Sequence, residues 1–362
     1  MHANGCRRLL WLVILVLDFC LLSGAFVSLA DDQSFRILSI QQDECTLLDQ
    51  PIYQTKIIWN AAANKTNRVQ CADYASGPWQ PLVEFPASRG PMLFFDRSLT
   101  PMTQKFYRVT APYSTQVLTL VLDRSGSLYG IGTGLVNAVS AFIGHYVENS
   151  DQAGLASFAT AAKVDVPTWW IFKNAITNTV KTLIFSGWTC SDQGLEKARQ
   201  QNDGVTTVPG GSITKVIVFF TDGSPTAFQY TFNCGVRNIA SDRSLWDPTT
   251  GAPSSDGCIV PATIPSVDGT SIVATADSAQ ILAEAQKRAE AIANQARETG
   301  NTIYSIGLGI GVDEDFLKKV ANDLSSGSYN PNQPAGLSMI AINFDDLPGV
   351  FDSVARAILQ LP

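Results

Sequence analysis

The chain has 362 residues, of which 45% are hydrophobic and 16% charged, and its formal net charge is −7. It is long enough for two domains and apolar enough to bury a substantial core. The acidic balance, with no basic stripe along the sequence, argues against a nucleic-acid partner.

The first 30 residues have the layout of a secretory signal peptide. Arg7 and Arg8 precede an apolar run over residues 9–22, and a small-x-small sequence ends at Ala30. An uncleaved signal anchor is the alternative, because residues 9–30 are about long enough to span a bilayer. Under both interpretations the rest of the chain is secreted, periplasmic or on the cell surface. An anchor of this kind would be its contact with a membrane.

The seven cysteines fit an oxidising compartment. Two of them belong to the predicted signal. Cys45 and Cys71 lie in the first region of the chain, Cys234 and Cys258 lie together in a later segment, and Cys190 is left over. The simplest scheme is two local disulfide bonds, one within each region, and one free thiol, although connectivity does not follow from sequence.

Residues 34–112 predict a small β-sandwich, because short strand-like runs alternate with Pro- and Gly-containing turns and show no helical period. The runs cover residues 35–40, 56–59, 68–71, 81–85, 92–95 and 106–110. The pattern resembles the fibronectin type III-like modules of secreted bacterial proteins, with Trp59 on a central strand and residues 106–109 closing the module.

A different pattern begins at residue 116. Residues 117–122 are all apolar or β-branched, which predicts a strand buried on both faces, as in a parallel sheet. The strand ends in Asp123-x-Ser125-x-Ser127, which places one carboxylate and two hydroxyls at a turn. Such oxygen ligands suit a hard divalent cation, and open α/β sheets bind ligands at the carboxyl ends of their strands.

The elements that follow alternate between helices and strands. Helical periodicity covers residues 128–148 and 172–183, and a strand pair joined by a turn lies between them at 153–167. A Gly-containing turn then presents Thr189 just before a helix whose first turn carries Asp192.

Two more buried strands follow, at residues 215–221 and 302–308, and the first of them ends in Asp222-Gly223. The helix between these strands begins near Asp277 or Ser278 and ends at Gly300. Further helices fit residues 314–321 and 346–359. We therefore predict an α/β fold with a doubly wound, mostly parallel sheet and helices on both faces, preceded by the small all-β sandwich.

Three separated elements together resemble the von Willebrand factor A (VWA) domain. They are the Asp-x-Ser-x-Ser motif, the threonine turn and the Thr-Asp-Gly sequence that ends the second strand, and the resemblance covers residues 115–362. Five side chains match the metal-ion-dependent adhesion site of that family. They are Asp123, Ser125, Ser127, Thr189 and Asp222.

The resemblance implies a resident Mg²⁺ ion, with Mn²⁺ or Ca²⁺ as alternatives. The hydroxyls would bind the ion directly and the carboxylates largely through water. An open coordination position would then accept an acidic side chain from a protein partner. The residues expected at the rim of this binding face are Arg124, Gly126, Trp188, Asp192, Gly223 and Ser224.

Residues 224–276 depart from the family pattern as an insertion directly after Asp222-Gly223. The segment contains five prolines and little apolar periodicity, so we expect a long loop. Its position at the end of the strand suggests that it sets partner specificity, and a surface excursion without function is the alternative.

Three function classes remain from the sequence. The first is a metal-dependent adhesion protein, and the second is a structural or assembly subunit of a surface appendage, such as a pilus-associated VWA protein. A hydrolase is the least favoured, because the two histidines, His2 and His145, provide no good base for a nucleophilic triad. Asp123 and Asp222 could act as a carboxylate pair, but both are already needed for the ion.

Overall fold

The computed structural model describes residues 7–9, 36–47, 50–60, 67–85, 91–98, 105–110, 114–208 and 212–359. The chain forms two compact units, the first ending at Tyr113 and the second running from Ser114 to Ile358. Of the predicted signal peptide or anchor, Arg7–Leu9 is described, as strand β1, and the rest of its apolar run lies outside the described residues. Within those residues, no helix has the length and apolar character that crossing a membrane requires.

The first unit consists of two antiparallel sheets that share a core. One sheet has the order β1-β2-β3-β6 and the other β5-β4-β7. The strands are β1 (Arg7–Leu9), β2 (Arg36–Leu47), β3 (Gln50–Asn60), β4 (Asn67–Ala72), β5 (Gln80–Phe85), β6 (Pro91–Ser98) and β7 (Phe106–Thr110). Trp59 is fully buried between the sheets, and its indole nitrogen donates to Asn67 Oδ1 at 3.3 Å. All six predicted strand runs of this region are strands, and the likeness to fibronectin type III modules stays a prediction.

The predicted bond between Cys45 and Cys71 is not formed. Cys71 is a free and buried thiol on β4, where it faces the core beside Trp59 and Tyr107. Cys45 lies on β2, which belongs to the other sheet and pairs there with β3 through Ile52. Closeness in the sequence was therefore no guide to the pairing, and Cys71 remains a buried thiol on β4. Burial raises the pKa of the Cys71 thiol.

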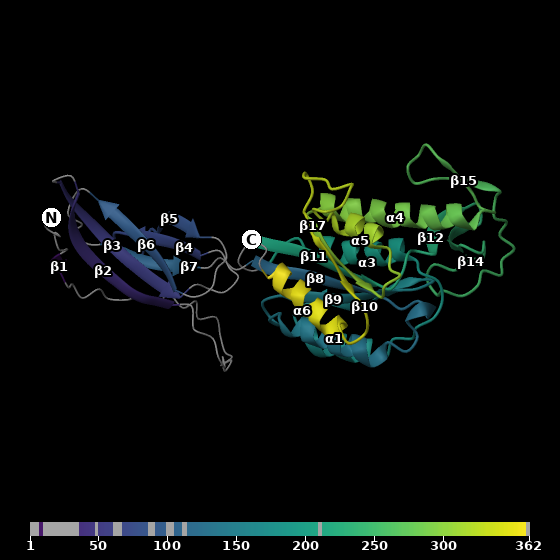
Figure 1. Ribbon diagram of the computed structural model, residues 1–362, viewed down its shortest axis with the longest axis horizontal. Coiled ribbons are helices and arrows are strands. Elements are labelled where there is room, and N and C mark those ends of the chain that lie inside the picture. Colours follow the sequence, from purple (N-terminus) through teal and green to yellow (C-terminus); the bar gives the residue numbers. More distant parts are fainter. Residues whose placement is uncertain are drawn as a thin grey trace. The chain divides into compact units, whose positions relative to one another are not determined.

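The second unit is built on a six-stranded sheet with the order β10-β9-β8-β11-β17-β18 (Figure 1). Its strands are β8 (Ser114–Asp123), β9 (Gln152–Phe158), β10 (Ala162–Trp169), β11 (Ser212–Thr221), β17 (Asn301–Leu308) and β18 (Leu337–Ala341). All neighbours are parallel except the edge strand β10. The connection order reverses between β8 and β11, which is the place where open α/β sheets form a crevice for ligands.

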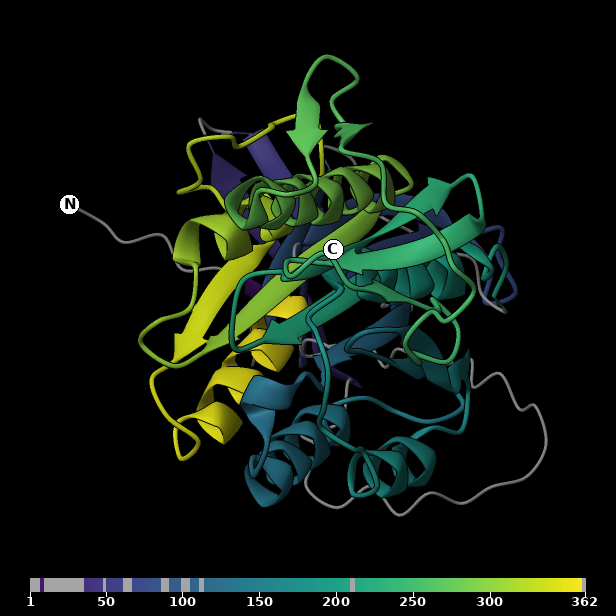
Figure 2. The same cartoon turned by 90° about the vertical axis from the view of Figure 1, so that its right-hand side faces the viewer.

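Helices cover both faces of this sheet, as predicted. The helices α1 (Gly132–Gly144), α2 (Lys173–Val180) and α6 (Leu347–Ile358) pack together on one face, and α3 (Ser191–Asp203), α4 (Ser278–Glu298) and α5 (Glu314–Ala321) on the other. Figure 2 shows α4 in green on one side of the sheet and α1 and α6, in blue and yellow, on the other. The alternation of the β11 side chains explains this division: Phe219 stacks on Phe158 beneath α3 and α5, whereas Phe220 packs on Phe351 of α6.

One helix boundary and one strand differ from the sequence prediction. The helix expected from residue 128 is preceded by a 3-10 turn, η1 (Gly126–Leu128), and α1 begins only at Gly132, after Gly130 has adopted a φ of +97°. The strand β18 was not predicted at all. In contrast, the cap of α4 is confirmed, since the Asp277 side chain accepts from Ala279 N at 2.9 Å.

The insertion is ordered, and the expectation of a long irregular loop was wrong. It contains β12 (Ala227–Phe232), β13 (Gly235–Ala240) and β14 (Leu245–Trp246) in one sheet, and β15 (Thr263–Pro265) and β16 (Ile272–Ala274) in another. Phe228, Ile239 and Ile264 pack against Ile281 on α4. The Cys234–Cys258 disulfide bond is present as predicted, and Cys190 is free. A small core shared with α4 therefore gives this segment its structure.

Candidate functional site

Asp123 is the last residue of β8 and lies at the centre of the crevice between β8 and β11. Its side chain is fully buried, Oδ1 accepts from Ser125 N at 2.7 Å, and Oδ2 accepts from Thr221 Oγ1 at 2.6 Å. Burial raises the pKa of this carboxyl to about 7, in spite of the hydrogen bonds that favour its charged form. A carboxylate is therefore held rigidly in a place that disfavours its negative charge.

Ser125, Ser127 and Asp222 form a chain of oxygen atoms next to this carboxylate. Ser125 Oγ lies 3.2 Å from Ser127 Oγ, and Ser127 Oγ donates to Asp222 Oδ1 at 2.9 Å. Ser125 is buried and Ser127 is exposed, so the chain runs from the interior to the surface. Burial also raises the pKa of Asp222. The fold thus brings Asp222 to the Asp-x-Ser-x-Ser motif, from which it is separated by 95 residues in the sequence, counted from Ser127.

Thr221 is a member of this cluster that the sequence analysis did not include. It is the last residue of β11, its side chain is fully buried, and its hydroxyl fixes Asp123 and also contacts the backbone of Gly223. Its position directly before Asp222, at the end of a buried strand, was the available signal. Thr221 holds the carboxylate in place and is itself directed into the protein.

Thr189 reaches the same edge of the sheet on a third loop. Gly126 N donates to Gly187 O at 3.1 Å, which joins the loop after β8 to the turn that carries Thr189. Gly187 has a φ of +89°, and a Cβ at this position would collide with the Thr160 hydroxyl, so the turn requires glycine. The backbone nitrogen of Thr189 donates to Thr226 Oγ1 at 2.9 Å. The threonine turn is therefore fixed between the first loop and the start of the insertion.

The spacing of these oxygen atoms fits a small hard cation. Neighbouring ligands of an octahedral Mg²⁺ ion, each bound at about 2.0–2.1 Å, lie about 2.9–3.0 Å from one another. The separation of 3.2 Å between the two serine hydroxyls is close to this value and is also within hydrogen-bond distance. Among the described residues, no group of three or more His, Cys, Asp and Glu side chains could hold a metal ion. A cation here would need the hydroxyl oxygens as well.

The predicted rim residues have more varied surroundings than expected. The Arg124 guanidinium lies toward β9, where Nε donates to Ser157 Oγ at 3.1 Å. Asp192 is buried, and its carboxylate accepts from Cys190 Sγ and from Gln229 N of the insertion, at 3.1 and 3.0 Å. Burial raises the pKa of Asp192. It therefore anchors the insertion to α3 and does not lie on an exposed rim.

The other rim residues remain near the candidate site. Gly126 opens η1, Trp188 packs partly buried against Ala227 and Trp246, and Gly223 is half-buried beside Thr221. The Ser224 hydroxyl lies 3.3 Å from Asp313 Oδ2. Trp188 and Ser224 thus connect the candidate site with the insertion and with the start of α5.

Exposed apolar side chains surround this edge of the sheet, and the sequence analysis did not identify them. Tyr129 follows η1 and is 86% exposed, and Ile310 follows the end of β17 and is 92% exposed. Ile342 and Phe344 are exposed after the end of β18. Because β8, β17 and β18 are parallel within one sheet, their carboxyl ends lie at the same edge. The oxygen cluster therefore lies on an edge that also presents apolar side chains.

Comparison with solved structures shows the fold of this chain. The pilus adhesin SpaC from Lactobacillus rhamnosus GG, in its open conformation, matches 91% of this chain and 36% of its own, with a TM-score of 0.50 and 14% identity. The vWF domain of the type V pili tip protein Mfa5 from Porphyromonas gingivalis matches 69% of this chain and 96% of its own, with a TM-score of 0.44 and 15% identity.

A third similar structure is the proximal thread matrix protein 1 of the mussel byssus with a zinc-occupied MIDAS motif. It matches 68% of this chain and 46% of its own, with a TM-score of 0.41 and 17% identity, so this chain spans less than half the length of that protein. No family model matches the sequence, and no curated protein matches it. At these identities the likeness concerns the fold alone, which is similar to that of the pilus adhesin SpaC.

Proposed function

We propose that this chain contains a VWA domain whose metal-ion-dependent adhesion site is complete, and that it is a surface protein which binds a protein partner through a divalent cation. The observation that carries the proposal is the oxygen cluster of Asp123, Ser125, Ser127 and Asp222 at the point where the strand order reverses. Mg²⁺ is the proposed ion, because hydroxyl, carboxylate and water oxygens are the ligands that hard divalent cations prefer, and Mn²⁺ or Ca²⁺ are the alternatives.

The residues of the cluster would share the work of holding the ion. The serine hydroxyls and the Thr189 hydroxyl are neutral ligands, and the carboxylates of Asp123 and Asp222 compensate its charge from behind. The ion, when bound, would supply an electrophilic position open to an acidic side chain of the partner. Thr221 keeps Asp123 in one orientation, which orders the site before the ion arrives and lowers the entropic cost of binding.

The surrounding surface supports a partner that combines an acidic side chain with apolar neighbours. Tyr129 and Ile310 are exposed at the same sheet edge as the oxygen cluster. Exposed aromatic side chains are enriched at binding faces and often dominate their energetics. We infer that the acidic side chain meets the cation while apolar side chains of the partner contact Tyr129 and Ile310.

The insertion is the proposed determinant of partner specificity. It begins beside Thr189, through the hydrogen bond to Thr226, and its far end exposes Ile259 and Ile272. Exposed apolar residues on an ordered module suit contact with a partner. The Cys234–Cys258 bond limits the conformational entropy that such a module loses on binding.

A pull-down from the native surface fraction tests this function, with the protein as bait in Mg²⁺ and in EDTA. Partner capture should require Mg²⁺ and should fall about tenfold or more in Tyr129→Ala or Ile310→Ser, because each removes a large exposed contact. Ile171→Ser is the matched control, since Ile171 is 63% exposed after β10, which runs antiparallel and ends at the opposite edge. Capture that is equal in EDTA, or equal loss with the control, would contradict the proposal.

A role as a structural subunit of a surface appendage rests on the same site and differs in the partner. The pilus proteins among the similar structures are consistent with both roles. The two are distinguished by the captured protein: an appendage subunit supports assembly, whereas a host or surface ligand supports adhesion. We propose no enzymatic activity, because both carboxylates of the cluster serve the ion.

A further inference from the structure

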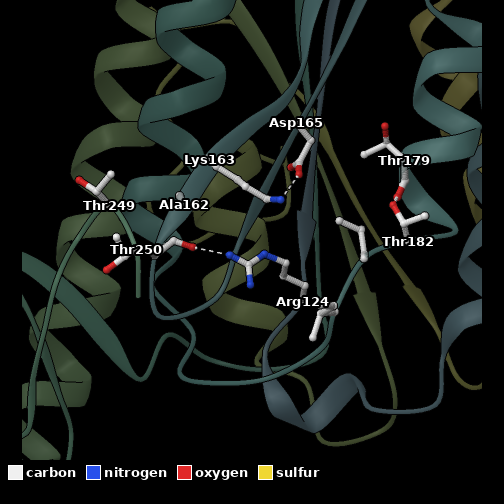
Figure 3. Close-up of a pocket in the computed structure, with 11 residues that line it drawn as sticks. Arg124, Ala162, Lys163, Asp165, Thr179, Thr182, Thr249 and Thr250 are labelled. Carbon is white, nitrogen blue, oxygen red and sulfur yellow. Dashed lines mark hydrogen bonds and ion pairs between the residues drawn. The ribbon is translucent and has the colours of Figure 1, made fainter. Parts of the chain in front are cut away.

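A second polar hollow lies beside the first loop and takes no part in the proposed cation site. It has a volume of about 280 Å³ and is lined by residues from four segments of the second unit. Arg124 comes from the loop after β8, Lys163 and Asp165 from β10, Thr179 and Thr182 from the end of α2 and the turn after it, and Thr249 and Thr250 from the insertion. Figure 3 shows the charged side chains directed into the hollow, with one threonine pair on each side.

Arg124 brings a positive charge into this hollow, and Asp165 and Asp123 are the carboxylates near enough to act on it electrostatically. Its Nε donates to Ser157 Oγ at 3.1 Å and its Nη2 to Ala161 O at 3.0 Å, and both acceptors are neutral. In the described part of the chain, no carboxylate lies at ion-pair distance from this guanidinium. A partly buried guanidinium is stabilised by an anion that can accept from its remaining N–H groups, and a carboxylate matches this geometry.

Asp165 provides the second, independent observation. Its side chain is only 2% exposed, Oδ1 pairs with Lys163 Nζ at 2.8 Å, and Oδ2 is buried with no hydrogen-bond partner among the described residues. A buried carboxylate oxygen without a donor is costly. The Arg124 guanidinium therefore has no carboxylate in direct contact with it, and Asp165 Oδ2 has no hydrogen-bond donor among the described residues.

We propose that this hollow binds a small carboxylic acid that also carries hydroxyl or ammonium groups. The carboxylate of the ligand accepts from Arg124, and a hydroxyl or ammonium group donates to Asp165 Oδ2. The threonine hydroxyls at the two sides supply further polar contacts. Because one wall belongs to the insertion, the bound acid would also tie the insertion to the sheet.

The test uses the whole chain in EDTA, so that its outcome does not depend on the proposed cation. Binding of D-glucuronate and L-glutamate is measured by calorimetry and by amide chemical shifts. Acetate is the control with a carboxylate alone, and D-glucose the control with hydroxyls alone. The proposal requires one of the two acids to bind saturably and at least about tenfold more tightly than both controls. Glucuronate would identify the donor as hydroxyl, and glutamate as ammonium.

Two substitutions locate the binding. Arg124→Gln should weaken the preferred acid about tenfold or more, the effect of losing one charge-assisted hydrogen bond. Asp165→Asn keeps the shape of the side chain, and it should weaken the same acid while leaving acetate unchanged. Arg356→Gln is the matched control, because Arg356 lies exposed on α6 and pairs with Asp352. Thermal melting confirms that each variant is folded. Absence of saturable binding by both acids, or equal affinity in Arg124→Gln, would overturn the proposal.

Discussion

The sheet and the insertion of the second unit meet at the candidate site, but they are held together in different ways. Strands β8 and β11 are apolar and fully buried over most of their length, and nine residue pairs align them in parallel. The insertion has a small core of its own and joins the sheet through polar contacts such as Asp192 to Gln229 N, and Asn238 to Gln193. The proposed ion site therefore lies on the rigid sheet. The residues proposed to set partner specificity lie on the insertion, whose sequence can vary without disturbing the ion site.

Replacement of residues 224–276 with a short Gly/Ser link tests this separation most strongly. We expect ion binding to be retained and partner capture to be lost, because the oxygen cluster lies on the sheet edge and the exposed Ile259 and Ile272 are removed. The replacement also uncovers Ile281 on α4, so it should be combined with Ile281→Gln to keep the protein soluble. Calorimetry and pull-down measure the two properties independently.

Full partner capture after this replacement would show that the insertion does not contribute to partner binding. Recognition would then be located around Tyr129 and Ile310. Loss of ion binding together with capture would show instead that the sheet edge depends on the insertion, through the contact between Thr189 and Thr226. The second result would remove the contrast between the two parts.

Within the sheet, Asn202→Ala should lower the free energy of unfolding of the whole second unit by roughly 3–4 kcal/mol. Asn202 is fully buried on α3, donates to Val216 O and Asn301 Oδ1, both at 2.8 Å, and accepts from Thr119 Oγ1 at 2.8 Å. The substitution leaves these groups without a partner in the interior. The midpoint of urea unfolding, followed by circular dichroism, gives the change, and a loss below about 1 kcal/mol would contradict the expected role.

Removal of the Cys234–Cys258 bond should have a smaller and more local effect. The bond closes a sequence separation of 24 residues, so its loss should cost about 2–3 kcal/mol in the insertion. Amide hydrogen exchange of the double Cys→Ser variant should accelerate in β12 and β13 and stay unchanged in β8 and β11. Faster exchange throughout the sheet would mean that the two parts unfold together.

Asn238→Ala is the counterpart of Asn202→Ala on the insertion, and its expected effect is the smallest. Asn238 accepts from Gln193 Nε2 at 2.8 Å and donates to Thr160 O. We expect a loss of about 1–2 kcal/mol, confined to the contact between β13 and the sheet. Partner capture should weaken, while the affinity for the ion should stay within twofold of the wild-type value. Pull-down and calorimetry on the same preparation measure the two effects.

The sequence predicted the sheet well because its signals are local. The buried strands appear as apolar runs, and four of the five proposed ion-site residues lie at or just after the ends of β8 and β11, whereas Thr189 lies in the turn before α3. In contrast, β18 is a short edge strand whose place is set by pairing with β17, from Tyr304↔Leu337 onward. The role of Asp192 depends on Gln229, 37 residues away. Such long-range contacts have no local signature.

The insertion shows the same limit in another form. Phe228, Tyr230 and Phe232 alternate with polar residues and could have predicted a strand. The prolines and glycines of the segment outweighed this pattern, and the α4 surface that completes the core follows the insertion in sequence. The spacing of the cysteines likewise gave no sign that Cys71 remains a free, buried thiol.

Calorimetric titration of Mg²⁺ and Mn²⁺ into the wild type and Asp123→Ala tests the central claim most directly. We predict one ion per chain for the wild type and no measurable binding for the variant, with a fold that circular dichroism shows to be retained. Arg356→Gln, on the exposed face of α6, should bind like the wild type. Equal binding by the wild type and Asp123→Ala would contradict the account.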